Sequence, residues 1–174
     1  MNSIDIKRWG EFKVADLFEG IVRGKLPPVG KLQKGNTPVV TAYGKNQGVA
    51  LYADVEPQFS NEITVSMNGA LSGYFSYHDY AFAANPDCGV LIPKRKLSKH
   101  VARYLCAILN RVGNKYYFGE KITWKKLKVE TIKLPITDKG QPDWKYMEQF
   151  IIEREAKVAN FLDVLYEWES SILW

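Results

Sequence analysis

The sequence predicts an α+β fold, in which a curved mixed sheet with short helices forms a globular domain and a long helix follows it. Three observations predict this class. The chain before Ser98 is rich in strand patterns and contains no long helical pattern. Residues 98–113 show one clear amphipathic helix. From Asp143 an apolar heptad runs to the last residues without Gly or Pro.

The first third of the chain reads as short strands separated by turn residues. Residues 9–20 mix a strand with a turn of helix and stop at Gly20. Residues 21–36 are dense in Gly, Pro and Lys, so we expect a long loop. The β-branched TPVVTA and the VALYA that follows it flank YGKNQG, a segment typical of a turn, and predict a hairpin.

The next block continues the sheet and then turns into a helix. EITVSM reads as a strand and NGALSG as a turn, after which YFSYHDYAFAA and GVLIP add further strands. Ser98 is placed to cap the helix that follows, and Gly113 to end it. The apolar face of this helix comprises Val101, Leu105, Ile108 and Leu109.

The segment after this helix is a polar and aromatic loop. We expect a short helical turn from Thr123 and a strand near residues 129–134 that Pro135 closes. Asp143, directly after Pro142, is placed to cap the last helix.

The last helix carries a seam with alternating spacings of four and three residues. One heptad position holds Ile151, Val158, Leu165 and Ile172, and the other holds Met147, Arg154, Phe161 and Trp168. At 1.5 Å per residue the helix would be about 45 Å long, which is more than a domain of this size covers by itself. We therefore expect these eight residues to pair with a helix of another chain, with lengthwise packing on the chain's own sheet as the alternative. The expected division is a globular domain at 1–142 and a dimerisation or docking helix at 143–174.

Charge is distributed in blocks. Residues 94–128 hold 11 Lys or Arg and one acidic residue, whereas residues 143–174 hold 3 Lys or Arg and 7 Asp or Glu. A basic segment beside an acidic helix predicts a polyanion-binding face and a separate protein-binding element. A solvated lysine-rich surface is the plainer alternative.

Sequence signatures of targeting and catalysis fail in turn. The first residues contain no apolar signal segment, no apolar run is long enough to span a bilayer, and Cys88 and Cys106 fit no zinc spacing, so we expect a reduced cytoplasmic chain. GKLPPVGKL is one residue too long for a phosphate loop, and its Leu32 replaces the hydroxyl that binds Mg²⁺. Asp143 and Glu155 imitate a nuclease carboxylate pair but lie on one predicted helix. We expect no catalytic residue, metal or cofactor.

The remaining candidate is a DNA-binding surface, because lysine and arginine neutralise phosphates while aromatic and amide side chains contact bases. The candidate DNA-binding residues are Lys45, Asn46, Lys94, Arg95, Lys96, Asn114, Lys115, Tyr116, Lys121, Thr123, Trp124, Lys125 and Lys126. Tyr117 and Phe118 lie among them. For each aromatic residue, packing against the sheet is an equally good interpretation.

Three segments of the sequence resemble a known family. They are WGEFKVADLFEG, NEITVSMNGALSGYFSY with AFAANPDCGVLIPK, and NKYYFGEKITWKKLKVETIKLPITDKGQPDWKYMEQFI. Together they resemble the target recognition domain of the specificity subunit of type I restriction-modification systems, which also occurs in related type II systems. The resemblance covers most of the chain, and the last segment is its most specific part.

The resemblance implies a non-catalytic DNA-reading subunit. Such a domain reads one half of a split target in double-stranded DNA, and its subunit docks onto methyltransferase subunits that supply the methyl-transfer chemistry. Full specificity subunits carry two recognition domains and two long helices, whereas this chain shows one of each. The resemblance therefore implies a half-subunit that forms a homodimer through its last helix and reads a palindromic bipartite site. A truncated or isolated domain stays open, as does a protein-interaction module of the same fold that binds methyltransferase subunits, or mimics a specificity subunit, without reading DNA.

Overall fold

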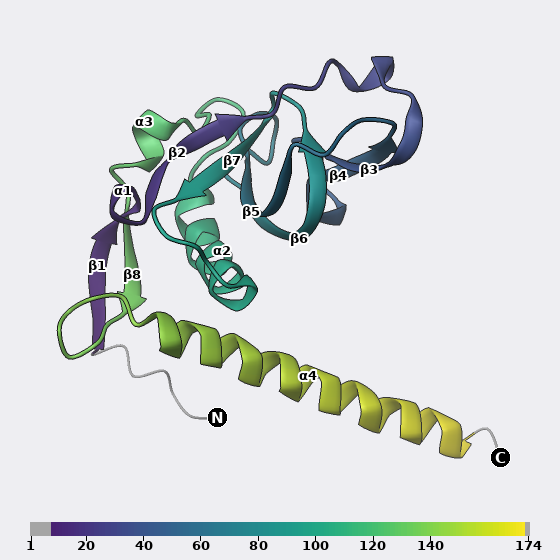
Figure 1. The fold of residues 1–174 in the computed structure, drawn as a ribbon. Helices are drawn as coiled ribbons and strands as arrows, with labels where there is room; N and C mark the ends of the chain where they lie inside the picture. Colours follow the sequence, from purple (N-terminus) through teal and green to yellow (C-terminus); the bar gives the residue numbers. More distant parts are fainter. Residues whose placement is uncertain (1–7, 173–174) are drawn as a thin grey trace.

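A computed structural model describes residues 8–172, with side-chain surroundings given through residue 163 and at Leu165. The chain forms two sheets, a few short helices and one long helix, so the predicted α+β class is confirmed (Figure 1). No helix among these residues combines the length and the apolarity needed to cross a lipid bilayer.

The smaller sheet joins the two ends of the globular part. Strand β1 (Trp9–Lys13) pairs antiparallel with β8 (Thr131–Pro135), and Trp9 lies opposite Pro135. The short helix α1 (Val14–Leu17) follows β1 directly. This pairing places the start of the described chain beside the segment that leads into the last helix.

The larger sheet has six strands in the order β2-β7-β5-β6-β3-β4. The pairing is antiparallel except between β3 and β6, which run parallel, so the sheet is mixed as predicted. The bounds of these strands are β2 Phe18–Arg23, β3 Lys34–Val40, β4 Val49–Ala53, β5 Phe59–Ser66, β6 Phe75–Ala84 and β7 Cys88–Pro93. Two single 3-10 turns lie at Val29–Lys31 (η2) and Asn46–Gly48 (η3).

The expected loop over residues 21–36 is shorter than the sequence suggests. Ile21, Val22 and Arg23 belong to β2 and lie opposite Leu91, Val90 and Gly89 of β7. The expectation of a loop there is wrong because pairing with a distant strand outweighs the neighbouring Gly and Pro residues. At the other end of this segment, β3 begins at Lys34, so only residues 24–33 lie between strands.

Helix α2 (Lys99–Gly113) packs against the larger sheet and provides much of the core. Ser98 caps it by accepting a hydrogen bond from the Val101 backbone N–H. Val101, Leu105 and Leu109 are buried on one face, as the apolar spacing predicts. Thr123 caps the short helix α3 (Trp124–Leu127) in the same way. Both predicted caps are confirmed.

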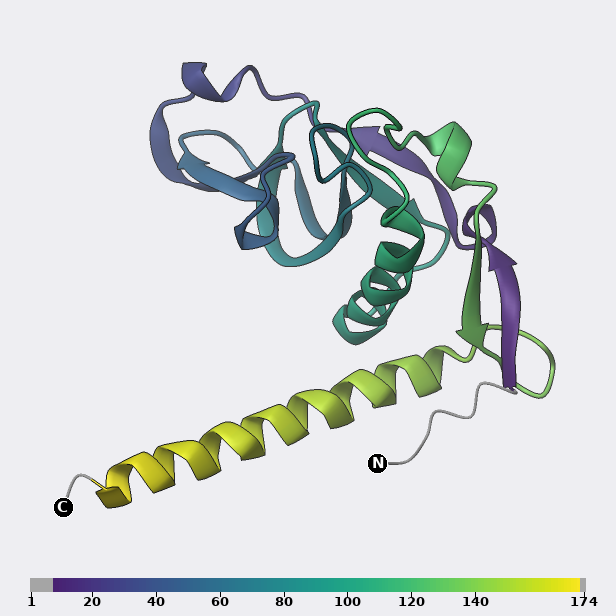
Figure 2. The same ribbon diagram turned by 180° about the vertical axis from the view of Figure 1, so that it is seen from behind.

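The last helix, α4 (Trp144–Ile172), begins within the core and continues past it. Asp143 accepts a hydrogen bond from the Tyr146 backbone N–H at 2.9 Å, which confirms the predicted cap. Met147 is 0% exposed and packs in the same core cluster as α2. Both views show the later turns of α4 extending beyond the rest of the molecule (Figures 1 and 2).

Candidate nucleic-acid interface

Three loops from distant parts of the sequence meet near the C-terminal end of α2. The ideal Cβ position of Gly44 lies 3.0 Å from Leu71, which joins the first loop to the second. The backbone N–H of Ile122 donates to Ser72 Oγ at 3.0 Å, which joins the second loop to the third. We name the surface formed by residues 41–48, 67–74 and 114–126 the loop face.

The contact between the second loop and the C-terminal end of α2 depends on two glycines. The ideal Cβ position of Gly113 lies 1.8 Å from the carbonyl oxygen of Gly73, and Gly73 itself has a φ of +91°. Neither position has room for a side chain. The side-chain amide of Asn110 adds a second link, because it accepts from the Phe75 N–H and donates to the Phe75 carbonyl. The C-terminal end of α2 thereby fixes where these loops lie.

The loop face carries exposed cations. Lys45, Lys121 and Lys125 are exposed, and no carboxylate of the described residues lies within ion-pair distance of them. Lys115 and Lys126 are instead paired with Glu130 and Glu120. The first three lysines are therefore the ones most available to phosphate groups.

Polar and aromatic side chains surround these cations. Asn46 and Asn114 are exposed, and Asn46 has a left-handed backbone (φ 49°), a conformation that asparagine tolerates. Exposed aromatic rings come from all three loops, namely Tyr43, Tyr74, Tyr117 and Phe118. The sequence did not predict Tyr43, Tyr74 or the exposed Leu71 as contact residues, because the exposure of a loop side chain leaves no pattern in the sequence.

Three of the predicted contact residues have internal roles. Tyr116 is 6% exposed, and its hydroxyl donates to the Glu130 carboxylate at 2.9 Å. Burial and this neighbouring carboxylate raise the pKa of Tyr116. The expectation that its ring stacks on DNA is contradicted, because the ring packs in the core. Thr123 caps α3 with its hydroxyl, and Trp124 is half-buried against the main core.

The basic segment predicted as one unit is divided by α2. Lys94, Arg95 and Lys96 are exposed, but they precede the helix, whereas Lys115 and the later lysines follow it. The 15 residues of α2 separate the two groups by about 22 Å at 1.5 Å per residue. The Arg95 guanidinium lies 4.7 Å from the ring centroid of Trp144, the first residue of α4. This group therefore lies at the junction with α4 and outside the loop face.

The heptad seam of α4 has two environments along one face. Met147 is buried and Ile151 is half-buried against the main core, whereas Val158, Phe161 and Leu165 of the seam are exposed, as is the adjacent Leu162. Phe161 is 62% exposed. Arg154 lies between these regions, with its guanidinium 4.9 Å from the Phe150 ring centroid. The expectation that Met147 pairs with another chain is contradicted, because the chain's own core covers it. Trp168 and Ile172 lie outside the residues whose side chains are described.

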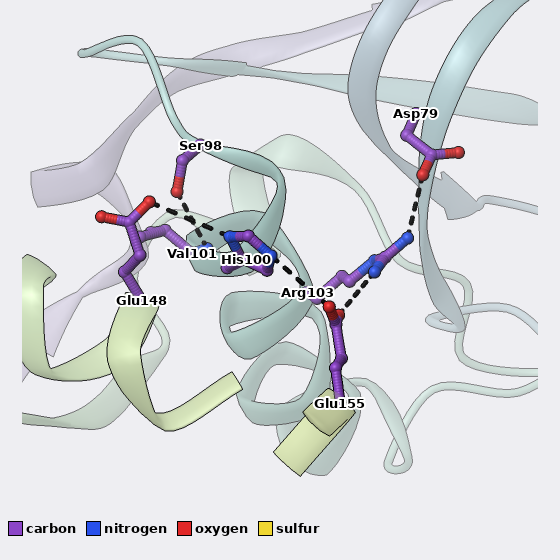
Figure 3. A network of polar contacts seen from close by, with 7 residues as sticks. All are labelled: Asp79, Ser98, His100, Val101, Arg103, Glu148 and Glu155. Carbon is purple, nitrogen blue, oxygen red and sulfur yellow. Dashed lines mark hydrogen bonds and ion pairs between the residues drawn. The ribbon is translucent and has the colours of Figure 1, made fainter. Parts of the chain in front are cut away.

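Polar contacts fix α4 against α2 where the two environments meet (Figure 3). Arg103 donates to Glu155 at 2.5 Å and to Asp79 at 2.9 Å, so one guanidinium joins α2, α4 and β6. His100 lies 3.4 Å from Glu155 and 4.0 Å from Glu148. The hydrogen bond from Arg103 holds the pKa of Glu155 below its ordinary value.

The two carboxylates that imitate a nuclease pair, Asp143 and Glu155, each bond to a different partner. Asp143 caps the start of α4, and Glu155, about three turns further along the same helix, is bonded to Arg103. Across the described residues no cluster of three His, Cys, Asp or Glu side chains is arranged to hold a metal ion. Burial raises the pKa of each cysteine thiol to about 12.

A family model matches most of the chain. The model of the family described as type I restriction modification DNA specificity domain matches residues 6–161. The specificity subunit S.BcgI of a type II restriction enzyme from Heyndrickxia coagulans is 28% identical over 163 residues. That alignment covers 92% of this chain and 47% of the relative.

Solved structures share the fold at low sequence identity. The S subunit of a type I restriction-modification system from M. genitalium gives a TM-score of 0.60 at 13% identity, over 94% of this chain and 44% of its own. The HsdS subunit from Thermoanaerobacter tengcongensis gives 0.56 at 16% identity, over 91% and 40%. A chain from a structure on complex assembly and conformational transition of the type I R-M system gives 0.60 at 17% identity, over 98% and 44%. The chain thus spans less than half the length of each of these relatives.

Proposed function

The chain belongs to the type I restriction modification DNA specificity domain family, and from this membership we propose that it is a sequence-specific DNA-binding specificity subunit or half-subunit. In this proposal the protein reads part of a bipartite target in double-stranded DNA and performs no catalysis itself. Its methyltransferase partners dock onto it and carry out the chemistry.

The loop face is the observation that carries the DNA-binding part of the proposal. Loops from three regions of the sequence present exposed lysines, asparagines and aromatic rings at one end of α2. Lysines bind phosphates without regard to sequence, and amide and aromatic groups contact bases. We assign phosphate contact to Lys45, Lys121 and Lys125, and base contact to Asn46 and Asn114.

Phosphate contact is tested by a salt series on duplex DNA. Because each neutralised phosphate adds about −0.9 to the slope of log affinity against log salt, replacing Lys45, Lys121 and Lys125 with Glu should flatten that slope by about 2 to 3. The matched control replaces three exposed lysines outside the loop face, Lys31, Lys34 and Lys139, with Glu. Equal losses in both triple variants would refute a specific loop face, and salt-independent binding by the unmodified protein would refute phosphate recognition.

The exposed part of the α4 seam supports a homodimer with two recognition domains. The face that is buried on the core at Met147 continues as exposed Val158, Phe161, Leu162 and Leu165 beyond Glu155. An apolar stripe with this spacing is typical of a helix that packs on another helix. We propose that residues 143–174 pair with the same helix of a second copy, and that residues 1–142 form the recognition domain.

Dimerisation is tested by placing charge on the stripe. Replacing Val158 and Leu165 with Asp should give monomers in sedimentation velocity, while the globular part stays folded. Ala156 and Asn160 lie about 160–200° around the helix from Val158, so the same two Asp substitutions there are the control. A dimer that survives in the stripe variant would refute pairing through this face. Dimerisation without any DNA binding would favour the protein-interaction alternative.

A further inference from the structure

The tip of the third loop is a tight turn that presents one apolar ring. The backbone N–H of Tyr117 donates to the Glu120 carbonyl at 3.2 Å, and the Glu120 N–H donates back to the Tyr117 carbonyl at 3.0 Å. Phe118 and Gly119 are therefore the two central residues. Phe118 is 70% exposed, the highest value among the large apolar side chains that the structure describes.

The turn is held firmly on both sides. Tyr116 is buried before it, and Ile122 is buried after it at 0% exposure. The Lys126 ammonium bonds to both the Glu120 carboxylate and the Lys121 carbonyl, which ties the turn to α3. Single exposed apolar side chains are ordinary on a protein surface. Phe118 differs from these because the turn that carries it is anchored at both ends, so its backbone is already placed before a partner binds.

The surroundings of Phe118 match duplex DNA. The Lys121 ammonium lies 5.4 Å from the centre of the Phe118 ring, and Lys125 is exposed on the short helix α3 that follows. A cation beside an apolar apex suits a phosphate next to a base stack. Phenylalanine has no group that hydrogen-bonds a base edge, but it is among the residues that insert between base steps.

From this geometry we propose that Phe118 is a specificity-determining wedge that inserts at one base-pair step of the target and unstacks it. The inference rests on the proposed DNA-reading function and adds a residue and a mode of contact to it. Because flexible steps unstack more easily than stiff ones, the wedge would select the sequence at that step without hydrogen bonds.

The test uses a duplex selected by the full chain from a random-sequence pool, with 2-aminopurine replacing each adenine of either strand in turn. The fluorescence of 2-aminopurine rises when its base is unstacked. We expect a rise at one step with the unmodified protein and no rise with Phe118→Ala, while Phe118→Leu keeps part of it. Phe118→Ala should weaken binding to the selected duplex about tenfold, the scale of one lost stacking contact, and binding to random duplex less than twofold. Tyr52→Ala, at an exposed ring on β4, is the control and should change neither.

The outcomes separate the wedge from the broader proposal. If the unmodified protein binds its selected duplex in a salt-dependent way but no position brightens, the wedge is wrong and DNA reading stands. The wedge is also wrong if the unmodified protein unstacks no step and Phe118→Ala merely loses the preference for a thymine. That pair of results would indicate that the ring contacts a base edge. If the unmodified protein selects no sequence and binds no duplex, both proposals fall.

Discussion

Acidification should destabilise this protein through one buried histidine. His78 on β6 is 0% exposed, and both ring nitrogens have partners: Nε2 lies 2.9 Å from Thr64 Oγ1, and Nδ1 lies 3.0 Å from the Tyr80 hydroxyl. Thr64 donates its own proton to the Ser76 carbonyl. A neutral ring that donates from Nε2 and accepts at Nδ1 satisfies this network, whereas a protonated ring must donate to Tyr80 as well.

The magnitude follows from the pKa of His78. Burial lowers it from 6.5 to about 4, against a smaller opposing effect of Asp79. Because the folded protein binds this proton less tightly than the unfolded chain, the stabilisation is complete above pH 6.5 and is lost as the pH falls toward 4. The loss is about 2 kcal/mol at pH 5 and approaches about 3 kcal/mol below pH 4.

Urea denaturation at pH 7.5, 6.5, 5.5 and 5.0 measures this loss. His78→Gln keeps a neutral donor, so it should lower stability at pH 7.5 by about 1–3 kcal/mol and then vary little down to pH 5. His100→Gln removes the other histidine of the sequence, which faces Glu148 and Glu155, and should leave the loss of stability on acidification in place. Burial raises the pKa of Glu62, so acidification stabilises the folded state through this group, opposite to the effect of His78. This contribution is present in the unmodified protein and in both variants. Equal pH slopes for the unmodified protein and His78→Gln would refute the reasoning.

Two further predictions concern the contacts that α2 makes near the loop face. Asn110→Ala should lower the free energy of unfolding by about 2 kcal/mol, because the Phe75 backbone loses two hydrogen-bond partners. Urea denaturation measures this loss. A loss below about 0.5 kcal/mol would contradict a stabilising role of the two hydrogen bonds. Gly113→Ala should lower the melting temperature and weaken duplex binding, because the new methyl group would clash with the Gly73 carbonyl. The control is Gly30→Ala, where the ideal Cβ position has no neighbouring atom within 4 Å. Equal melting temperatures in the two variants would contradict the close contact.

Local features of the fold could be predicted from the sequence because they depend on neighbouring residues. The caps at Ser98, Thr123 and Asp143 each use a side chain that bonds a backbone N–H three residues later. The apolar spacing of α2 likewise predicted the residues that it buries. Such features require no knowledge of the rest of the chain.

Features that depend on distant residues could not be predicted. Strand β2 extends to Arg23 because β7 pairs with it. Tyr116 is buried because its ring packs in the core and its hydroxyl donates to Glu130. The basic segment looked continuous because sequence order hides the length of the helix inside it. The heptad of α4 indicated an apolar face but not where the globular core stops covering it, since that boundary is set by the position of α2.

Helix α2 connects the two surfaces that the proposed function requires and keeps them separate. Its C-terminal end holds the loop face through Asn110 and Gly113, and its first turns hold α4 through His100 and Arg103. Among the described residues, α4 is anchored by Met147 in the main core and by Glu155, which accepts a hydrogen bond from Arg103 of α2. Changes at the loop tips, Phe118 included, should therefore alter DNA reading without moving α4. A recognition surface that changes independently of the pairing helix would allow new DNA targets to arise on one unchanged assembly.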